Sequence, residues 1–222
     1  MEPTTLTSRR LRLRPFAAGD TDAVHLACQD PEILRWTEIP SPYTRADAEL
    51  FTATLAPAGW REDSGYHFAL VERSGALAGA LGLVRGPASG TYEVGFWLAR
   101  EHRGQGYGTE AVVRAAGWAF SVLGAVRLEW WAEVGNEASL AVALRAGFRR
   151  TGGRPARARA GAPPRELWSA SLFPADLGLP PSRPGRIPGG PGPRVAGARP
   201  AKAPGARAPG RPGSAAGPPE RR

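Results

Sequence analysis

Three glycines alternate with longer residues in the segment 103–108, which reads Arg-Gly-Gln-Gly-Tyr-Gly. The segment lies between a predicted strand over 91–98 and a predicted helix over 109–123. Glycine tolerates positive φ and lets a ligand come close to the backbone. A helix start offers unpaired N–H groups at the positive end of the helix dipole. We therefore expect this segment to bind a pyrophosphate, with Arg103 adding positive charge beside it.

Two common phosphate-binding loops do not fit this segment. The Walker-type loop requires a lysine after its last glycine, and the segment contains none. The dinucleotide fingerprint requires Gly-x-Gly-x-x-Gly near the start of a βαβ unit, whereas here the third glycine comes one residue early and three predicted strands precede it. The remaining pattern is the coenzyme A loop, Arg/Gln-x-x-Gly-x-Gly/Ala, which Arg103, Gly106 and Gly108 match without gaps.

Strand and helix patterns alternate around this segment. The predicted strands span 11–14, 67–71, 77–84, 91–98, 126–133 and 167–172, and the predicted helices span 21–28, 31–36, 45–55, 109–123 and 137–146. Thr44 and Asn136 are expected to cap two of the helices. Short turns join the second, third and fourth strands into an antiparallel meander. The expected fold class is α/β (α+β), with a mixed, mainly antiparallel sheet flanked by helices on both faces.

The net charge of +9 is concentrated near the C-terminus. Residues 180–222 hold nine of the 29 Lys and Arg residues but one of the 20 acidic residues, so the rest of the chain is nearly neutral. The segment is also rich in Pro and Gly, a composition that cannot bury enough apolar surface to fold. We expect a domain over 1–173 and a disordered tail over 174–222. The tail is either a solvated extension, which its lack of aromatic residues favours, or a basic tether for RNA, DNA or the ribosome.

Several classes of protein do not fit the composition. Cys28 is the single cysteine, and the three histidines lie far apart, so neither a disulfide framework nor a metal cluster is expected. The first ten residues lack the apolar stretch of a secretory signal. No apolar run approaches the roughly 20 residues of a membrane-spanning helix. We therefore expect a cytoplasmic protein that uses no metal and makes no membrane contact.

Four segments in this order resemble the GNAT superfamily of acyl-CoA N-acyltransferases, and within it the RimJ/RimL type. They are residues 6–15 with the following Asp22 and Ala23, the strand 93–98, the loop and helix start 103–111, and the helix start 136–139 with the later Gly147 and Phe148. Each segment alone is weakly diagnostic, but the four together cover about residues 6–150. The segment 149–164, rich in Arg, Ala and Pro, does not match the strand usual for the family.

The resemblance implies a co-substrate, acetyl-CoA, and a set of residues that bind it. The implied acetyl-CoA-binding residues are Phe96, Trp97, Leu98, Arg103, Gly104, Gln105, Gly106, Tyr107, Gly108, Thr109 and Asn136. The main chain of the strand 96–98 would pair with the pantetheine arm and polarise the thioester carbonyl. Asn136 has two compatible roles, since it can cap its helix and also contact CoA.

The resemblance also implies how the two protons of the reaction move. Many members use a tyrosine seven residues after the helix asparagine, but that position is Ala143 here. In the RimJ/RimL type a serine three residues after the asparagine protonates the leaving thiolate, and in this chain that position is Ser139. Glu93 is the candidate general base for the attacking amine. Both residues also have purely structural interpretations, Ser139 as a residue of a first helical turn and Glu93 as a charge at a strand end.

The acceptor is expected to bind near Trp36 and Tyr43, although core packing is the simpler interpretation for Trp36. The implied reaction is direct transfer of acetyl from acetyl-CoA to a primary amine in a ternary complex. The amine is either a protein N-terminal α-amine or a small-molecule amine. The alternative is a non-catalytic acyl-CoA-sensing domain whose basic tail binds nucleic acid or the ribosome. Both a monomer and a homodimer are compatible with the sequence.

Overall fold

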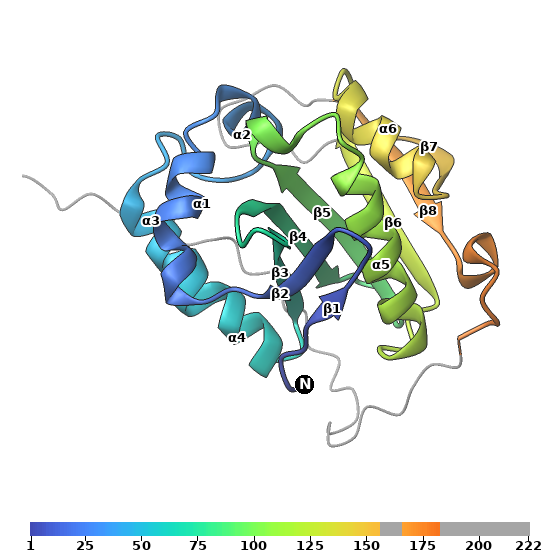
Figure 1. Cartoon of the computed structure of the whole chain (residues 1–222). Coiled ribbons are helices and arrows are strands. Elements are labelled where there is room, and N and C mark those ends of the chain that lie inside the picture. The colour runs from blue at the N-terminus through green and yellow to red at the C-terminus, as the bar shows by residue number, and fades with distance from the viewer. Residues whose placement is uncertain (156–165, 183–222) are drawn as a thin grey trace, which may run out of the picture. The chain divides into compact units, whose positions relative to one another are not determined.

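An eight-stranded sheet organises the protein in the computed structural model, which describes residues 1–155 and 166–182 (Figure 1). The strands, in the spatial order β1-β2-β3-β4-β5-β6-β8-β7, are antiparallel to their neighbours except at the parallel pair β5 and β6. They are β1 (Leu6–Thr7), β2 (Leu11–Pro15), β3 (Gly65–Glu72), β4 (Leu77–Arg85), β5 (Thr91–Leu98), β6 (Arg127–Glu133), β7 (Arg149–Pro155) and β8 (Glu166–Leu172). The predicted mixed, mainly antiparallel sheet is confirmed.

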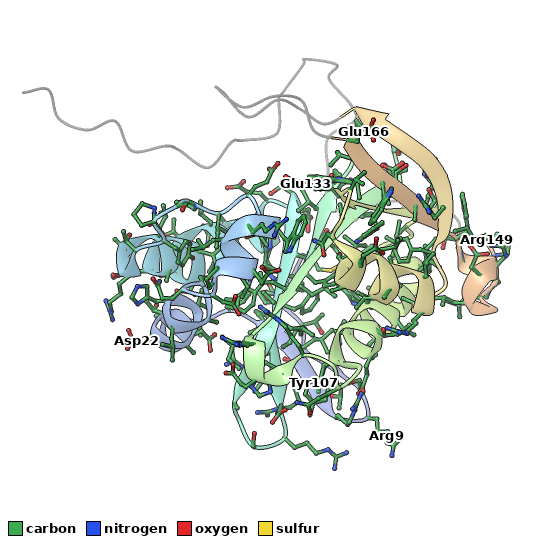
Figure 2. All side chains as sticks on the ribbon, turned by 90° about the horizontal axis from the view of Figure 1, so that it is seen from above. Arg9, Asp22, Tyr107, Glu133, Arg149 and Glu166 are labelled. Carbon is green, nitrogen blue, oxygen red and sulfur yellow. The ribbon has the colours of Figure 1, made fainter. Side chains whose placement is uncertain are left out.

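Helices cover both faces of this sheet (Figure 1). They are α1 (Thr21–Ala27), α2 (Pro31–Trp36), α3 (Arg45–Leu50), α4 (Ala56–Arg61), α5 (Tyr107–Ser121) and α6 (Glu137–Arg145). Seen from above, Asp22 on α1 and Arg149 at the start of β7 mark opposite sides of the fold (Figure 2). The predicted caps are confirmed, because Thr44 Oγ1 accepts from the N–H of Asp47 on α3 and Asn136 Oδ1 accepts from the N–H of Ser139 on α6.

Two apolar clusters follow from the alternation of side chains along the strands. In β3, Tyr66, Phe68 and Leu70 pack with α5 and α6, whereas Ala69 and Val71 pack with α1, α2 and α3. In β6, Leu128, Trp130 and Ala132 are buried and the intervening residues are half-buried. The sheet therefore separates a larger core beneath α5 from a smaller core beneath α1–α3.

The predicted helix over 45–55 is too short. A π-helical turn (Phe51–Leu55) joins α3 to α4, which ends at Arg61. Pro57 and Gly59 indicate a helix end in the sequence, but the helical path continues through them, and Pro57 lies in the first turn of α4 directly after the π-helical turn. Gly59 is required by packing, since a Cβ there would lie 2.5 Å from the carbonyl oxygen of Gly65 on β3.

Two further expectations about the C-terminal half need correction. The first part of the segment predicted to lack the family's strand, Arg149–Pro155, forms β7, an edge strand paired with β8, where Gly and Pro are tolerated. The rest of that segment lies outside the described residues. The packed part of the chain also continues past the expected boundary at residue 173. Leu177 and Leu179 pack against the larger core, and Ser182 Oγ donates to the carbonyl oxygen of Phe120 at 3.0 Å. The tail beyond Ser182, with its predicted disorder and predicted tether role, lies outside the described residues.

No helix within residues 1–155 and 166–182 is long and apolar enough to cross a membrane.

Candidate active site

The strands β5 and β6 separate halfway along their length. Their parallel ladder joins residues 91–93 to residues 127–129 and ends there. Beyond that point β5 stays paired with β4 as far as Leu98, and β6 stays paired with β8 as far as Glu133. The main-chain groups that β5 turns toward β6 after Glu93 therefore have no partner on that strand. A ligand with amide groups could pair with them.

The loop 103–108 leads from the end of β5 into α5. Gly104 and Gly106 have φ of +75° and +79°, a region that disfavours residues with a Cβ. Gly106 is the N-cap of α5, and no side chain among the described residues caps the helix. The first N–H groups of α5 consequently lack acceptors within the helix and lie at its positive end. Both the exposed glycine backbone and the uncapped helix start fit a pyrophosphate group.

The side chain of Arg103 is engaged in contacts with neighbouring segments that hold the loop in place. Its Nε donates to the carbonyl oxygen of Leu98 at 3.0 Å, and its Nη2 lies 3.0 Å from Oδ2 of Asp30 at the start of α2. Gln105 Nε2 donates to the carbonyl oxygen of Glu101. The charge of Arg103 is thus already shared with a carboxylate, and its contact with a phosphate remains a prediction.

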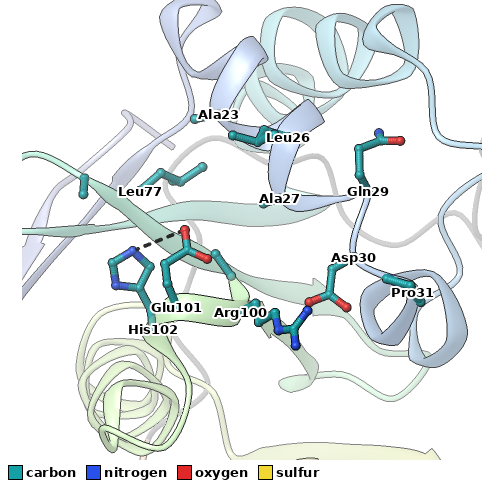
Figure 3. Close-up of a pocket in the computed structure, with 12 residues that line it drawn as sticks. Ala23, Leu26, Ala27, Gln29, Asp30, Pro31, Leu77, Arg100, Glu101 and His102 are labelled. Atoms are coloured by element: carbon teal, nitrogen blue, oxygen red, sulfur yellow. Dashed lines mark ion pairs between the residues drawn. The ribbon is translucent and has the colours of Figure 1, made fainter.

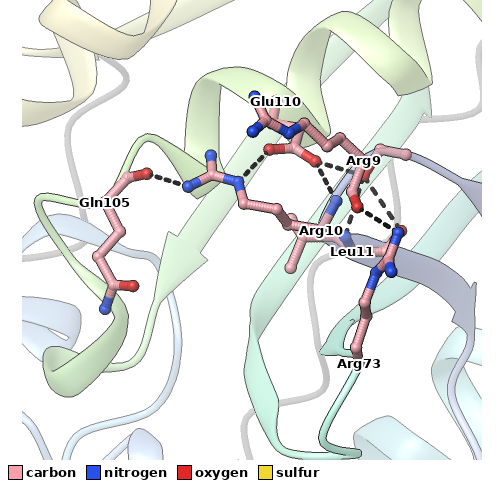
Figure 4. Close-up of polar contacts among 7 residues, drawn as sticks. Arg9, Arg10, Leu11, Arg73, Gln105 and Glu110 are labelled. Atoms are coloured by element: carbon pink, nitrogen blue, oxygen red, sulfur yellow. Dashed lines mark hydrogen bonds and ion pairs between the residues drawn. The ribbon is translucent and has the colours of Figure 1, made fainter.

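A second arginine, Arg10 in the turn between β1 and β2, also contacts the loop (Figure 4). Its Nη1 donates to the carbonyl oxygen of Gln105 at 2.7 Å, and its Nε donates to Oε2 of Glu110 at 2.7 Å. Glu110 Oε1 also accepts from Ser8 Oγ and from the N–H of Arg10. The guanidinium carbon lies 4.6 Å from the centre of the Tyr107 ring. Burial alone would raise the pKa of Glu110, but these hydrogen bonds more than offset it and lower the pKa.

The three strand residues expected to bind the pantetheine arm face alternate sides of the sheet. Phe96 and Leu98 pack against the core beneath α5, and Trp97 packs against the core beneath α1–α3. Close packing also joins the two helices at the site, because a Cβ at Gly108 on α5 would lie 3.2 Å from Val142 on α6. Thr109 is half-buried in the first turn of α5.

Ser139 lies in the first turn of α6, on the side of β6. Its hydroxyl oxygen accepts a 3.1 Å hydrogen bond from the indole Nε1–H of Trp130, and its main-chain N–H donates to Asn136 Oδ1 at 3.1 Å. Trp130 is the first residue of β6 after the ladder with β5 ends. Ser139 is therefore fixed near the point where the two strands separate.

Glu93 lies on the last rung of the β5–β6 ladder, opposite Glu129. It is half-buried, and its neighbours Tyr92 and Val94 belong to the core beneath α5. By strand alternation its side chain faces the opposite side of the sheet. Its role as general base remains a prediction.

The two expected acceptor residues differ in exposure. Tyr43 is 6% exposed and belongs to the core beneath α1–α3, and its burial raises the pKa of the phenol. Trp36 is half-buried at the end of α2, where its indole Nε1–H donates to Glu32. A Cβ at Gly135, next to Asn136, would lie 3.7 Å from its ring. The packing interpretation therefore fits Tyr43 better than Trp36, the reverse of the expectation from sequence.

A cavity of about 520 Å³ lies beside the loop, between the start of α2 and the helical turn η3 (Arg100–His102) (Figure 3). Asp30, Arg100, Glu101 and His102 are among its lining residues. None of the site residues predicted from the sequence lines it, although the Asp30–Arg103 ion pair connects its rim to the loop. In the part of the chain that the structure describes, no three His, Cys, Asp or Glu side chains are grouped as metal ligands.

Comparison with known proteins identifies the family of this chain. A family model described as the acetyltransferase (GNAT) domain matches residues 10–149. The chain belongs to the GNAT acetyltransferase family. The uncharacterized N-acetyltransferase p20 of Bacillus licheniformis is 26% identical over 150 residues, 67% of this chain and 84% of that protein.

Solved structures share the fold of this GNAT domain. Mycobacterium smegmatis RimJ in complex with CoA-disulfide matches with a TM-score of 0.71 and 19% identity, covering 81% of this chain and 93% of RimJ. RimL, a ribosomal L7/L12 α-N-protein acetyltransferase in complex with coenzyme A, matches with a TM-score of 0.70 and 16% identity, covering 77% of this chain and 98% of RimL. At this identity the likeness concerns the fold, and it confirms the RimJ/RimL-type architecture expected from the sequence.

Two residues of this GNAT site could not be found from sequence patterns. Arg10 lies in the segment that resembles the family's opening, but its partners Gln105 and Glu110 are about a hundred residues away. Trp130 reads as a core residue because it alternates with polar neighbours, and it is indeed 2% exposed. Its hydrogen bond to Ser139 depends on how α6 packs against β6, and a local sequence pattern does not predict that packing.

Proposed function

We propose that this protein transfers the acetyl group of acetyl-CoA to a primary amine by direct attack within a ternary complex. The observation that carries the proposal is the uncapped start of α5, with two positive-φ glycines before it, together with the part of β5 that is no longer paired with β6. A pyrophosphate at the helix start and an amide-containing arm along the strand together describe coenzyme A. The structures of RimJ and RimL, which share this fold, contain CoA, and this supports acetyl-CoA as the co-substrate.

Each part of the site would have its own task in the reaction. The helix start and the residues 104–108 would hold the pyrophosphate, and main-chain N–H groups of β5 would polarise the thioester carbonyl. Placing the amine beside the thioester supplies proximity, often the larger share of such catalysis. The carbon–sulfur bond breaks as the carbon–nitrogen bond forms, and Ser139 would donate its hydroxyl proton to the leaving sulfur.

The only cysteine of the chain argues for direct attack rather than an acetyl-enzyme intermediate. Cys28 is 1% exposed, and burial raises its pKa to about 12. A thiol with that pKa is almost entirely protonated at neutral pH, and the thiolate is the nucleophilic form. Cys28 is thus a poor covalent carrier of the acetyl group, which favours direct attack by the amine.

For the acceptor we propose an exposed α-amine at a protein or peptide N-terminus. An α-amino group has a pKa near 8, so a weak base or a water molecule can take its proton. RimL, whose fold this chain shares, is named for acetylating the α-amine of a ribosomal protein. A small-molecule amine remains the second candidate.

The test is a panel of peptides, small amines and aminoglycosides incubated with acetyl-CoA, with thiol release as the readout and mass spectrometry of the product. Each peptide is paired with the same peptide blocked at its N-terminus. We expect thiol release and one added acetyl group with free peptides, and neither with blocked peptides. Equal thiol release with both members of every pair would rule out the α-amine.

The role of Ser139 is tested separately. Ser139→Ala should lower kcat by about tenfold or more, in the range typical of a proton-transfer group, and leave the affinity for acetyl-CoA nearly unchanged. Ser121→Ala, on the exposed end of α5, is the matched control. An unchanged kcat in Ser139→Ala at saturation would return Ser139 to a purely structural role.

A further inference from the structure

The hydrogen bond between Trp130 and Ser139 has one possible direction. An indole N–H can donate but cannot accept, so Ser139 Oγ must be the acceptor. The hydroxyl proton of Ser139 then points away from Trp130. Ser139 is half-buried, and its hydroxyl donates no hydrogen bond to any of the described residues.

The position of the pair matters as much as its direction. Trp130 follows directly after the last β5–β6 rung, and its indole is held in the core beneath α5. Asn136 caps α6 through the N–H of Ser139, which fixes the backbone of the serine. The side chain and the backbone of Ser139 are thus held by different residues, and its hydroxyl oxygen is held near the point where β5 and β6 separate.

From this geometry we propose that Trp130 is a positioning residue for Ser139, an inference that rests on the proposed function. The indole N–H orients the serine so that its proton is presented to the sulfur of the leaving thiolate. As the carbon–sulfur bond breaks, the hydroxyl proton moves to sulfur, and the proton shed by the new amide nitrogen replaces it. Oxygen gains negative charge during this exchange, and a hydrogen bond to an oxygen strengthens as that charge develops.

Trp130→Phe tests this role because it keeps the apolar ring and removes the N–H. We expect kcat to fall about tenfold and the KM for acetyl-CoA to change less than twofold. Trp118→Phe is the matched control, since Trp118 is 5% exposed in the same core. The decisive comparison is a double-mutant cycle. In a Ser139→Ala background, Trp130→Phe should cause no further loss of kcat, whereas a loss of the same size in both backgrounds would overturn the proposal.

A second measurement does not depend on turnover. The indole N–H resonance that disappears in Trp130→Phe identifies Trp130 in a nitrogen–proton correlation spectrum. We expect coenzyme A to shift this resonance in the wild type and not in Ser139→Ala, because the thiol reaches the indole only through the serine hydroxyl. If coenzyme A shifted the Trp130 resonance but the protein acetylated no amine, the proposed function would be refuted, while the contact of coenzyme A with the Trp130–Ser139 pair would stand. Turnover with an additive cycle, or a CoA response unaffected by Ser139→Ala, would refute the role of Trp130.

Discussion

Arg10 Nη1 donates a 2.7 Å hydrogen bond to the carbonyl oxygen of Gln105, a residue 95 positions later in the chain. The same guanidinium is held by Glu110 in the first turn of α5. The turn between β1 and β2 is thereby tied both to the glycine-rich loop and to the helix that the loop precedes. A loop held in its binding conformation before the ligand arrives loses less conformational entropy on binding.

Removing the Arg10 side chain should weaken acetyl-CoA binding. In Arg10→Ala the loop loses its hydrogen bond at Gln105, and we expect the KM for acetyl-CoA to rise about tenfold, equivalent to about 1.4 kcal/mol. The measurement is initial velocity against acetyl-CoA concentration at saturating amine. Arg12→Ala, an exposed arginine on β2, should keep the wild-type KM. A wild-type KM in Arg10→Ala would show that the loop does not need this contact.

A side chain at Gly95 should block the acceptor without affecting acetyl-CoA. Gly95 is exposed on β5, no atom of the described residues lies within 4 Å of its Cβ position, and its neighbour on β4 is another glycine, Gly82. By alternation with Phe96, this open surface is on the sheet face opposite α5, from which we expect the amine to approach.

Gly95→Leu is therefore expected to lower kcat/KM for the amine by about tenfold or more, a loss of about 1.4 kcal/mol or more, with acetyl-CoA affinity unchanged. Gly117→Ala on α5 is the control. It adds a methyl group where no atom of the described residues lies within 4 Å, and kcat/KM for the amine should stay unchanged. If Gly95→Leu kept full activity toward every acceptor, the amine would have to approach from elsewhere.

His67 should make folding stability sensitive to acid. Its ring packs between Gly65 and Gly82 and against Phe51 at 5.6 Å between ring centres, and burial lowers its pKa to about 4. In the unfolded chain a histidine takes up its proton near pH 6.5. Because the unfolded state binds more protons between these values, the free energy of unfolding should fall by about 3 kcal/mol as pH falls from 6.5 to 4.

Urea titrations at several pH values measure this slope. The variant His67→Phe should lose most of the dependence, whereas His25→Gln on α1 should keep it. The larger ring of phenylalanine can itself change stability, so the slope with pH is the readout rather than the stability at one pH. The same slope in His67→Phe as in the wild type would show that another group is responsible.

Local patterns predicted the parts of this fold that depend on local physics. Alternating side chains located β6, and Thr44 and Asn136 located two helix starts, because a strand face and a helix cap are set by a few neighbouring residues. The glycines of the loop were informative for the same reason, since positive φ is a local requirement. The phosphate contact of Arg103 remains a prediction, and its ion pair with Asp30 could not be predicted from local patterns.

Contacts between distant segments could not be predicted in this way. The sequence of β7 lacks a clear alternation, and it becomes a strand because β8 offers it an edge. Tyr43 looked like a ligand-binding residue in a loop and is instead covered by the packing of α1–α3. The contacts of Arg10 and Trp130 likewise arise only once the helices are placed on the sheet.

The central claim is that the loop 103–108 and the start of α5 form the acetyl-CoA site. The most direct test is a calorimetric titration of acetyl-CoA into the wild type, Gly106→Val and Gly178→Val. Gly178 also has positive φ, at +68°, but it follows Leu177 in a segment whose Ser182 contacts Phe120, near the C-terminal end of α5. We predict saturable binding to the wild type and Gly178→Val and none to Gly106→Val. Equal affinity of all three proteins for acetyl-CoA would contradict the claim.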